Sequence, residues 1–159
     1  MAIPLGTQER LATQLDVLRM FLEGPSAAYA EIAPEDGGWS AKENVAHLAR
    51  HAHVFLGRVD RILKEDRPDL GTYRPEKDAE WPLWRALPLD EALRRLRAIR
   101  AQLLAWVDAL SEEQTGRVGV HPQFGEWNIE RWLEFFLLHE AHHLYFMVRR
   151  LAQAQGRRA

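Results

Sequence analysis

Four long segments of this chain repeat apolar residues with the 3.6-residue period of an amphipathic α-helix. No stretch sustains the two-residue alternation of a half-buried strand, and no Asn-Gly pair stands between two apolar runs as a hairpin signal. This pattern limits the fold more than any other feature, and it predicts an all-α protein. Because 159 residues is the length of one ordinary domain, we expect a single domain over residues 1–159.

The first two predicted helices have recognisable starts. The first follows Thr7, which we expect to be its N-cap, and it pauses at Gly24 before a proline. Ser40 and Glu43 match a capping box, in which each side chain satisfies a free backbone N–H of the first helical turn. A second helix is therefore predicted from Ser40 to about Lys64.

Residues 66–87 connect the second helix to the third. They hold three prolines, which block a regular helix, but also Tyr73, Trp81 and Trp84, which are too many aromatic residues for a flexible linker. We expect a packed crossover loop, followed by a third helix that starts at Pro88.

Glycine and proline residues between Gly116 and Gly125 predict a second loop. A fourth helix should begin at Asn128, with Trp127 and Trp132 spaced as a hydrophobic staple, and continue to about residue 153. Four helices with a long crossover between the second and third predict a four-helix bundle that departs from simple up-down-up-down wiring.

Composition excludes several classes of protein. The net charge is −2, and the basic run of Arg94, Arg95, Arg97 and Arg100 has the spacing of a solvated helix face, so we expect no nucleic-acid partner. No apolar run is long enough to span a membrane, and the first residues lack the pattern of a secretory signal, so we expect a cytoplasmic protein. With no cysteine, the chain offers no thiolate ligand or thiol nucleophile of its own.

Histidines on two of the predicted helices suggest a metal site. His139 and His143 lie four residues apart on an apolar face of the fourth helix, and His47 and His51 repeat that spacing on the second. Buried imidazoles need hydrogen-bond partners or a metal. Two ligands from one helix and a third, either His47 or His51, from the facing helix would leave positions open for water or substrate, as in catalytic sites.

Glu140 allows a second interpretation, because residues 139–143 also spell the HExxH motif of zinc peptidases, in which the glutamate is the general base. No histidine or acidic residue follows His143 to complete such a site, and no strand is predicted to hold a peptide. Glu140 is therefore a weak catalytic candidate, with a solvent-facing or bundle-edge carboxylate as the alternative.

Other polar residues receive simpler interpretations. Arg58 lies eleven residues after His47 on nearly the same helix face, where it either meets an anion or, as we favour, extends over the surface. His121 is expected to be exposed in its loop, with contact to a ligand as the alternative. His53 and His142 point away from the histidine faces.

Two motifs carry a family resemblance. Residues 39–48, which read WSAKENVAHL, and residues 139–143, which read HEAHH, resemble the DinB-like (DinB/YfiT) superfamily of four-helix-bundle metalloenzymes. The resemblance implies a divalent metal, commonly nickel or zinc, held by His47, His139 and His143, with His51 the fallback ligand. It also implies homodimers, and no DNA binding. Many members carry a Gly-Gln turn after the last histidine, where this chain reads Leu144-Tyr145.

Some members of that superfamily are transferases or isomerases that use bacillithiol, mycothiol or glutathione. Our first hypothesis is accordingly a metal-dependent enzyme that transfers a low-molecular-weight thiol to a small electrophile. The second is a non-catalytic, dimeric bundle that binds a metal or a ligand, for example in a stress response. The third, less favoured, is an HExxH metallohydrolase.

Overall fold

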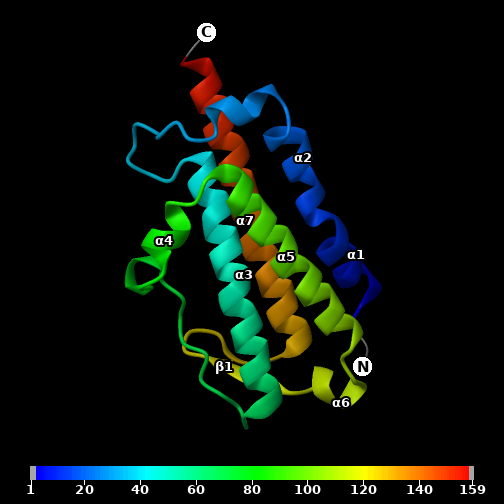
Figure 1. Ribbon diagram of the computed structural model, residues 1–159. Helices are drawn as coiled ribbons and strands as arrows, with labels where there is room; N and C mark the ends of the chain where they lie inside the picture. Colours follow the sequence, from blue (N-terminus) through cyan, green and yellow to red (C-terminus); the bar gives the residue numbers. More distant parts are fainter. Residues whose placement is uncertain (1–2, 158–159) are drawn as a thin grey trace.

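Four long helical rods form the body of the molecule in the computed structural model (Figure 1), which describes residues 3–157. The ends of the predicted 1–159 domain therefore lie outside the described residues. The rods are a broken first helix, α3 (Ala41–Lys64), α5 (Leu89–Asp108) and α7 (Ile129–Gly156). The predicted four-helix bundle is confirmed.

The first rod differs in detail from its prediction. It consists of α1 (Leu5–Thr13), a 3₁₀ turn η1 (Gln14–Asp16) and α2 (Val17–Leu22), and a second 3₁₀ segment, η2 (Pro25–Tyr29), follows. Pro4, not Thr7, occupies the N-cap position, with the φ of −55° that proline fixes. The Thr7 hydroxyl instead donates to Glu134 of α7 at 2.6 Å, so Thr7 joins two rods rather than starting one.

The wiring depends on the crossover between α3 and α5. In Figure 1, α1, α2 and α7 ascend while α3 and α5 descend, so α3 and α5 run parallel side by side. A parallel pair of helices needs a connection as long as the bundle, and residues 65–88 provide it. They contain the 3₁₀ turn η3 (Pro75–Lys77) and the short helix α4 (Trp81–Arg85).

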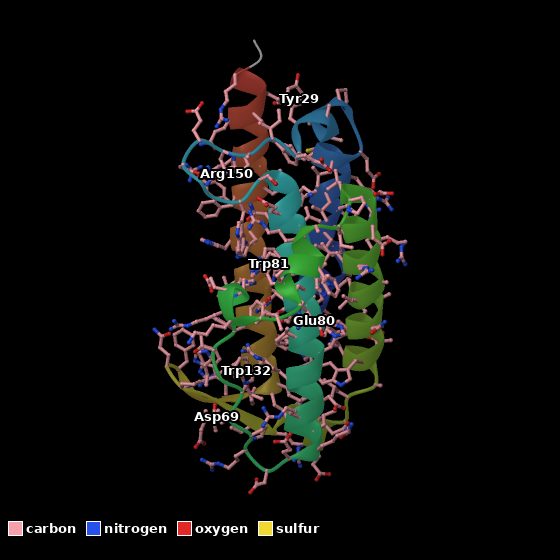
Figure 2. The ribbon with its side chains drawn as sticks, turned by 60° about the vertical axis from the view of Figure 1, so that its left-hand side comes forward. Tyr29, Asp69, Glu80, Trp81, Trp132 and Arg150 are labelled. Atoms are coloured by element: carbon pink, nitrogen blue, oxygen red, sulfur yellow. The ribbon has the colours of Figure 1, made fainter. Side chains whose placement is uncertain are left out.

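The crossover packs tightly on α3, as predicted. Figure 2 shows Glu80 and Trp81 where the crossover passes in front of α3. The Arg50 guanidinium of α3 donates two hydrogen bonds, of 2.6 and 2.9 Å, to the Asp78 carboxylate. The Tyr73 hydroxyl donates to the same carboxylate at 3.0 Å. Trp81 and Trp84 of α4 are buried, which fixes this segment against the bundle.

A small hairpin corrects the prediction of an entirely helical chain. After α6 (Glu112–Thr115), strands β1 (Val118–His121) and β2 (Gly125–Asn128) pair antiparallel where a loop was predicted. Gly125 closes the turn with a φ of +76°, a conformation that glycine adopts at little cost. The crossover pairs with β1 as well, since the Leu70 N–H donates to the Val120 carbonyl at 2.9 Å.

Local capping chemistry fixes the starts of the two helices that carry the histidines. The Ser40 hydroxyl accepts from the Glu43 N–H at 3.1 Å and the Glu43 carboxylate accepts from the Ser40 N–H at 2.7 Å, which confirms the predicted capping box of α3. The Asn128 side chain caps α7 by accepting from the Arg131 N–H. Among the described residues, none of the helices is long and apolar enough to cross a membrane.

Candidate metal centre

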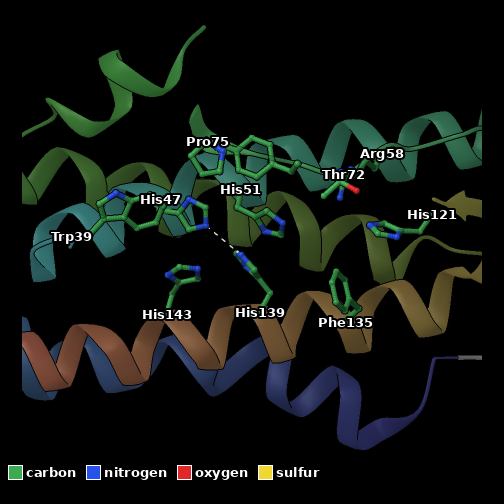
Figure 3. A pocket seen from close by; sticks show the side chains of 11 residues that line it. Trp39, His47, His51, Arg58, Thr72, Pro75, His121, Phe135, His139 and His143 are labelled. Carbon is green, nitrogen blue, oxygen red and sulfur yellow. Dashed lines mark hydrogen bonds between the residues drawn. The ribbon is translucent and has the colours of Figure 1, made fainter. Parts of the chain in front are cut away.

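Three histidines from α3 and α7 converge on one point (Figure 3). One ring nitrogen from each of His47, His139 and His143 lies within 4.8 Å of the others. The Nε2 atoms of His47 and His139 are 3.2 Å apart. In a tetrahedral zinc site with Zn–N bonds of about 2.0–2.1 Å, two ligand nitrogens stand about 3.3 Å apart. The two side chains therefore have the spacing that two ligands of one ion require.

The three imidazoles are held in the neutral form that binds metals. Burial, reinforced by repulsion from the other two histidines, lowers the pKa of His47 to about 2. Burial, with repulsion from His143, lowers the pKa of His139 to about 3, and burial, with repulsion from His142, lowers that of His143 to about 4. At neutral pH all three rings therefore offer a lone pair without first losing a proton.

Asn44 orients one of the three rings. Its amide nitrogen donates to the Ser40 carbonyl at 2.9 Å, which turns the amide oxygen toward His143. That oxygen lies 2.9 Å from His143 Nδ1, so Nδ1 carries the proton and Nε2 is left bare. Among the described residues, the Nδ1 atoms of His47 and His139 have no such partner. Asn44 lies three residues before His47 in the WSAKENVAHL motif, where its role could have been found.

Trp39 and His51 flank the cluster. The Trp39 ring lies 4.7 Å from the His47 ring and 5.8 Å from the His143 ring. His51, the fallback ligand, is buried and stacks on His139 at 3.8 Å between ring centroids, outside the three-histidine group. His51 therefore packs against the ring of His139.

Glu140 faces away from the histidines. Its carboxylate is only 1% exposed and pairs with Arg100 of α5, while Gln14 donates to it at 2.7 Å. The alternative of a solvent-facing or bundle-edge carboxylate was therefore wrong, and so was the solvated position predicted for Arg100, which is buried. Since Glu140 is not among the residues that line the cavity beside the histidines, it is not placed to act as a general base.

A cavity of about 230 Å³ opens beside the cluster. It is lined by Trp39, His47, His51, Arg58, Thr72, Tyr73, Pro75, His121, Phe135, His139 and His143. Within residues 3–157, none of these lining residues is an aspartate or glutamate. The crossover contributes Thr72, Tyr73 and Pro75, which nothing in the local sequence marked as site residues.

Two residues of the lining were predicted to be exposed and are buried instead. Arg58, expected to extend over the surface, is 8% exposed because the crossover covers it, and its guanidinium donates to the Gly71 carbonyl at 3.0 Å. His121, expected in an open loop, lies on strand β1 and is 4% exposed because the rings of Phe124, Trp132 and Phe135 lie beside it. His53 and His142 are exposed and do not line this cavity, as predicted.

Comparison with known proteins agrees with this architecture. The sequence profile described as the DinB superfamily matches residues 10–147. The chain belongs to the DinB superfamily. Its similarity to YfiT from Bacillus subtilis, described as "a probable metal-dependent hydrolase with an unusual four-helix bundle topology", has a TM-score of 0.77 at 20% identity, over 95% of this chain and 86% of that one. At that identity the likeness establishes the shared fold.

Curated relatives of this DinB superfamily chain include proteins of Bacillus cereus (strain 03BB102) and Bacillus thuringiensis subsp. konkukian (strain 97-27). Both are named "Putative metal-dependent hydrolase", and both are 28% identical to this chain over 108 residues, or 67% of its length. The aligned region spans 61% of each relative's own length.

Proposed function

We propose that this protein is a divalent-metal-dependent enzyme in which His47, His139 and His143 hold the ion and a small molecule occupies the adjoining cavity. The observation that carries the proposal is the convergence of three neutral imidazole nitrogens within 4.8 Å at the wall of that cavity. Three protein ligands leave coordination positions for a substrate, as in catalytic rather than structural sites. Imidazole ligands suit nickel and zinc, the metals that the family resemblance suggests.

The reaction we propose is transfer of a low-molecular-weight thiol to a small electrophile. A divalent ion bound there supplies Lewis acidity and lowers the pKa of a thiol or water that it binds. Among the described residues, the cavity lining holds no carboxylate that could take a proton as general base. A thiol made acidic by the ion ionises at neutral pH without such a base, and so does metal-bound water, so the lining accommodates a thiol co-substrate while the choice of thiol over water rests on the family resemblance.

Hydrolysis is the second candidate, because relatives that are 28% identical carry the name of metal-dependent hydrolases. The same lining would then serve water as the nucleophile. On this alternative the substrate is cleaved without any thiol, which separates the two reactions experimentally.

The experiment compares the two reactions on one preparation. Protein reconstituted with zinc or with nickel is mixed with an electrophile such as 1-chloro-2,4-dinitrobenzene, with and without glutathione or cysteine, and loss of free thiol is followed. A panel of ester and amide substrates is assayed in parallel. The proposal predicts metal-dependent thiol consumption that is abolished in His47→Ala, whereas His53→Ala, an exposed histidine of the same helix, retains it.

Three other results would redirect the assignment. Ester or amide cleavage that needs the metal and no thiol would select the hydrolase. Stoichiometric metal with neither activity would select the non-catalytic bundle. Folded protein that binds no divalent metal would overturn the proposal altogether.

A further inference from the structure

Arg58 is a buried cation without an anionic partner. Its side chain is 8% exposed, and within residues 3–157 it forms no ion pair. Its single hydrogen bond among these residues runs from Nη2 to the Gly71 carbonyl, although a guanidinium has five N–H donors. A buried charge is costly unless it is paired, so an arginine that lines a cavity in this state is suited to an anion that enters the cavity.

Two further polar side chains line the same end of the cavity. Figure 3 shows Arg58, Thr72 and His121 toward one end and His47 and His143 toward the other. His121 Nδ1 accepts from the Gln123 N–H at 3.1 Å, so the proton of the neutral ring lies on Nε2. His121 therefore offers a donor, as does the Thr72 hydroxyl.

Arg58 lies far from the metal centre along the cavity. It is eleven residues, or about 16 Å of helix rise, beyond His47, and its guanidinium carbon lies 5.9 Å from the ring centroid of Trp132, seven residues before His139 on α7. A molecule that reaches both Arg58 and the three histidines must therefore be elongated.

We propose that Arg58, with Thr72 and His121, binds a carboxylate of the substrate, so that the enzyme selects small carboxylic acids whose reactive group lies at the three histidines. This inference rests on the proposed metal-dependent function. One cation and two neutral donors match a singly charged, planar group, and the guanidinium fork can bind a carboxylate through two parallel hydrogen bonds. The volume of about 230 Å³ limits the substrate to a small molecule.

Calorimetric titration tests the inference with succinate and its uncharged diamide, succinamide, as probes. We expect zinc-loaded protein to bind succinate more tightly than succinamide. Arg58→Gln should weaken succinate binding about 10- to 100-fold, the loss of a charged hydrogen-bonded partner, without changing the zinc content. Arg58→Lys, which keeps the charge but not the fork, should retain part of the affinity.

Matched variants separate recognition from folding. Lys64→Gln removes an exposed cation of the same helix, whose partner is Asp60 one turn earlier, and should leave succinate binding unchanged. Thr72→Val alters the pocket without touching α3 and should weaken succinate binding by a smaller factor. Thermal unfolding of each variant verifies that the protein is folded, and the lysine and valine variants carry the test if Arg58→Gln does not fold.

Specific results would overturn the inference while leaving the metal centre intact. Equal affinity for succinate and succinamide, or unchanged succinate affinity in Arg58→Gln, would do so. Binding that is lost in His139→Ala but kept in Arg58→Gln would place the carboxylate on the metal instead. If the protein binds no metal, the proposed function fails, and titrating the metal-free protein with succinate still decides whether Arg58 binds a carboxylate.

Discussion

Replacing Glu140 separates a structural role for this carboxylate from a catalytic one. The side chain follows His139 directly in sequence but contacts η1 and α5 instead. It accepts from Gln14 at 2.7 Å and pairs with Arg100, which in turn donates to the Leu11 carbonyl at 2.6 Å. These contacts tie three rods of the bundle together, so we predict that Glu140→Ala impairs stability and leaves the metal centre intact.

The magnitude follows from burial. Glu140 is 1% exposed and Arg100 is 6% exposed, so removing the carboxylate leaves a cation buried without its partner. Breaking such a pair typically costs about 3–5 kcal/mol, against a total stability of about 5–15 kcal/mol for a domain of this size. The double variant Glu140→Leu with Arg100→Met removes both charges and should recover most of that loss.

Urea unfolding, followed by circular dichroism, measures these differences. Glu134→Ala is the comparison variant, because Glu134 is an acid of the same helix that is 38% exposed, pairs with Arg10 and accepts from the Thr7 hydroxyl. Its loss should cost about 1–2 kcal/mol, less than the loss of the buried Glu140. Folded Glu140→Gln that binds metal normally yet loses all activity would refute this account and restore Glu140 as a catalytic base.

Three further predictions concern other parts of the fold. Asn44→Ala should weaken metal affinity about 10- to 100-fold in a chelator competition, because His143 loses the partner that orients it; unchanged affinity would contradict that role. Gly119→Ala should lower the free energy of unfolding measured in urea by about 1–3 kcal/mol, because the new Cβ would lie 2.7 Å from Leu70 Cδ1. Gly57→Ala is the control: nothing lies within 4 Å of its new Cβ, so it should not destabilise the protein. Metal-free protein should lose stability as the pH falls below 6.5. The buried His47 and His51 and the half-buried His139 and His143 have lowered pKa values, so the unfolded chain binds their protons first. Each contributes at most about 1.4 kcal/mol per pH unit, and equal unfolding free energies at pH 6.5 and 5 would argue against this.

Features encoded by neighbouring residues could be predicted from the sequence. The start of α3 depends on Ser40 and Glu43, three residues apart, and the start of α7 depends on Asn128. The four-residue spacing of His139 and His143 places both rings on one helix face without any tertiary information. The homodimer, the cytoplasmic location and the identity of the metal stay predictions.

Features that depend on distant contacts could not be predicted. Strand β1 has four residues, too few for a clear two-residue period, and it is held partly by the crossover. The burial of Arg58 and His121 likewise requires the crossover and the hairpin to cover them. Arg100 lies in a basic run that looks solvated, and only packing against α7 brings it to Glu140, forty residues away.

A metal titration determines whether one divalent ion binds at His47, His139 and His143. Metal-free protein is titrated with zinc and with nickel, and the bound metal is measured after gel filtration. We expect one ion per chain, with affinity at least about 100-fold weaker when any one of the three becomes alanine, and little changed in His53→Ala. Folded wild-type protein that binds neither metal, or alanine variants that bind as tightly as the wild type, would contradict it.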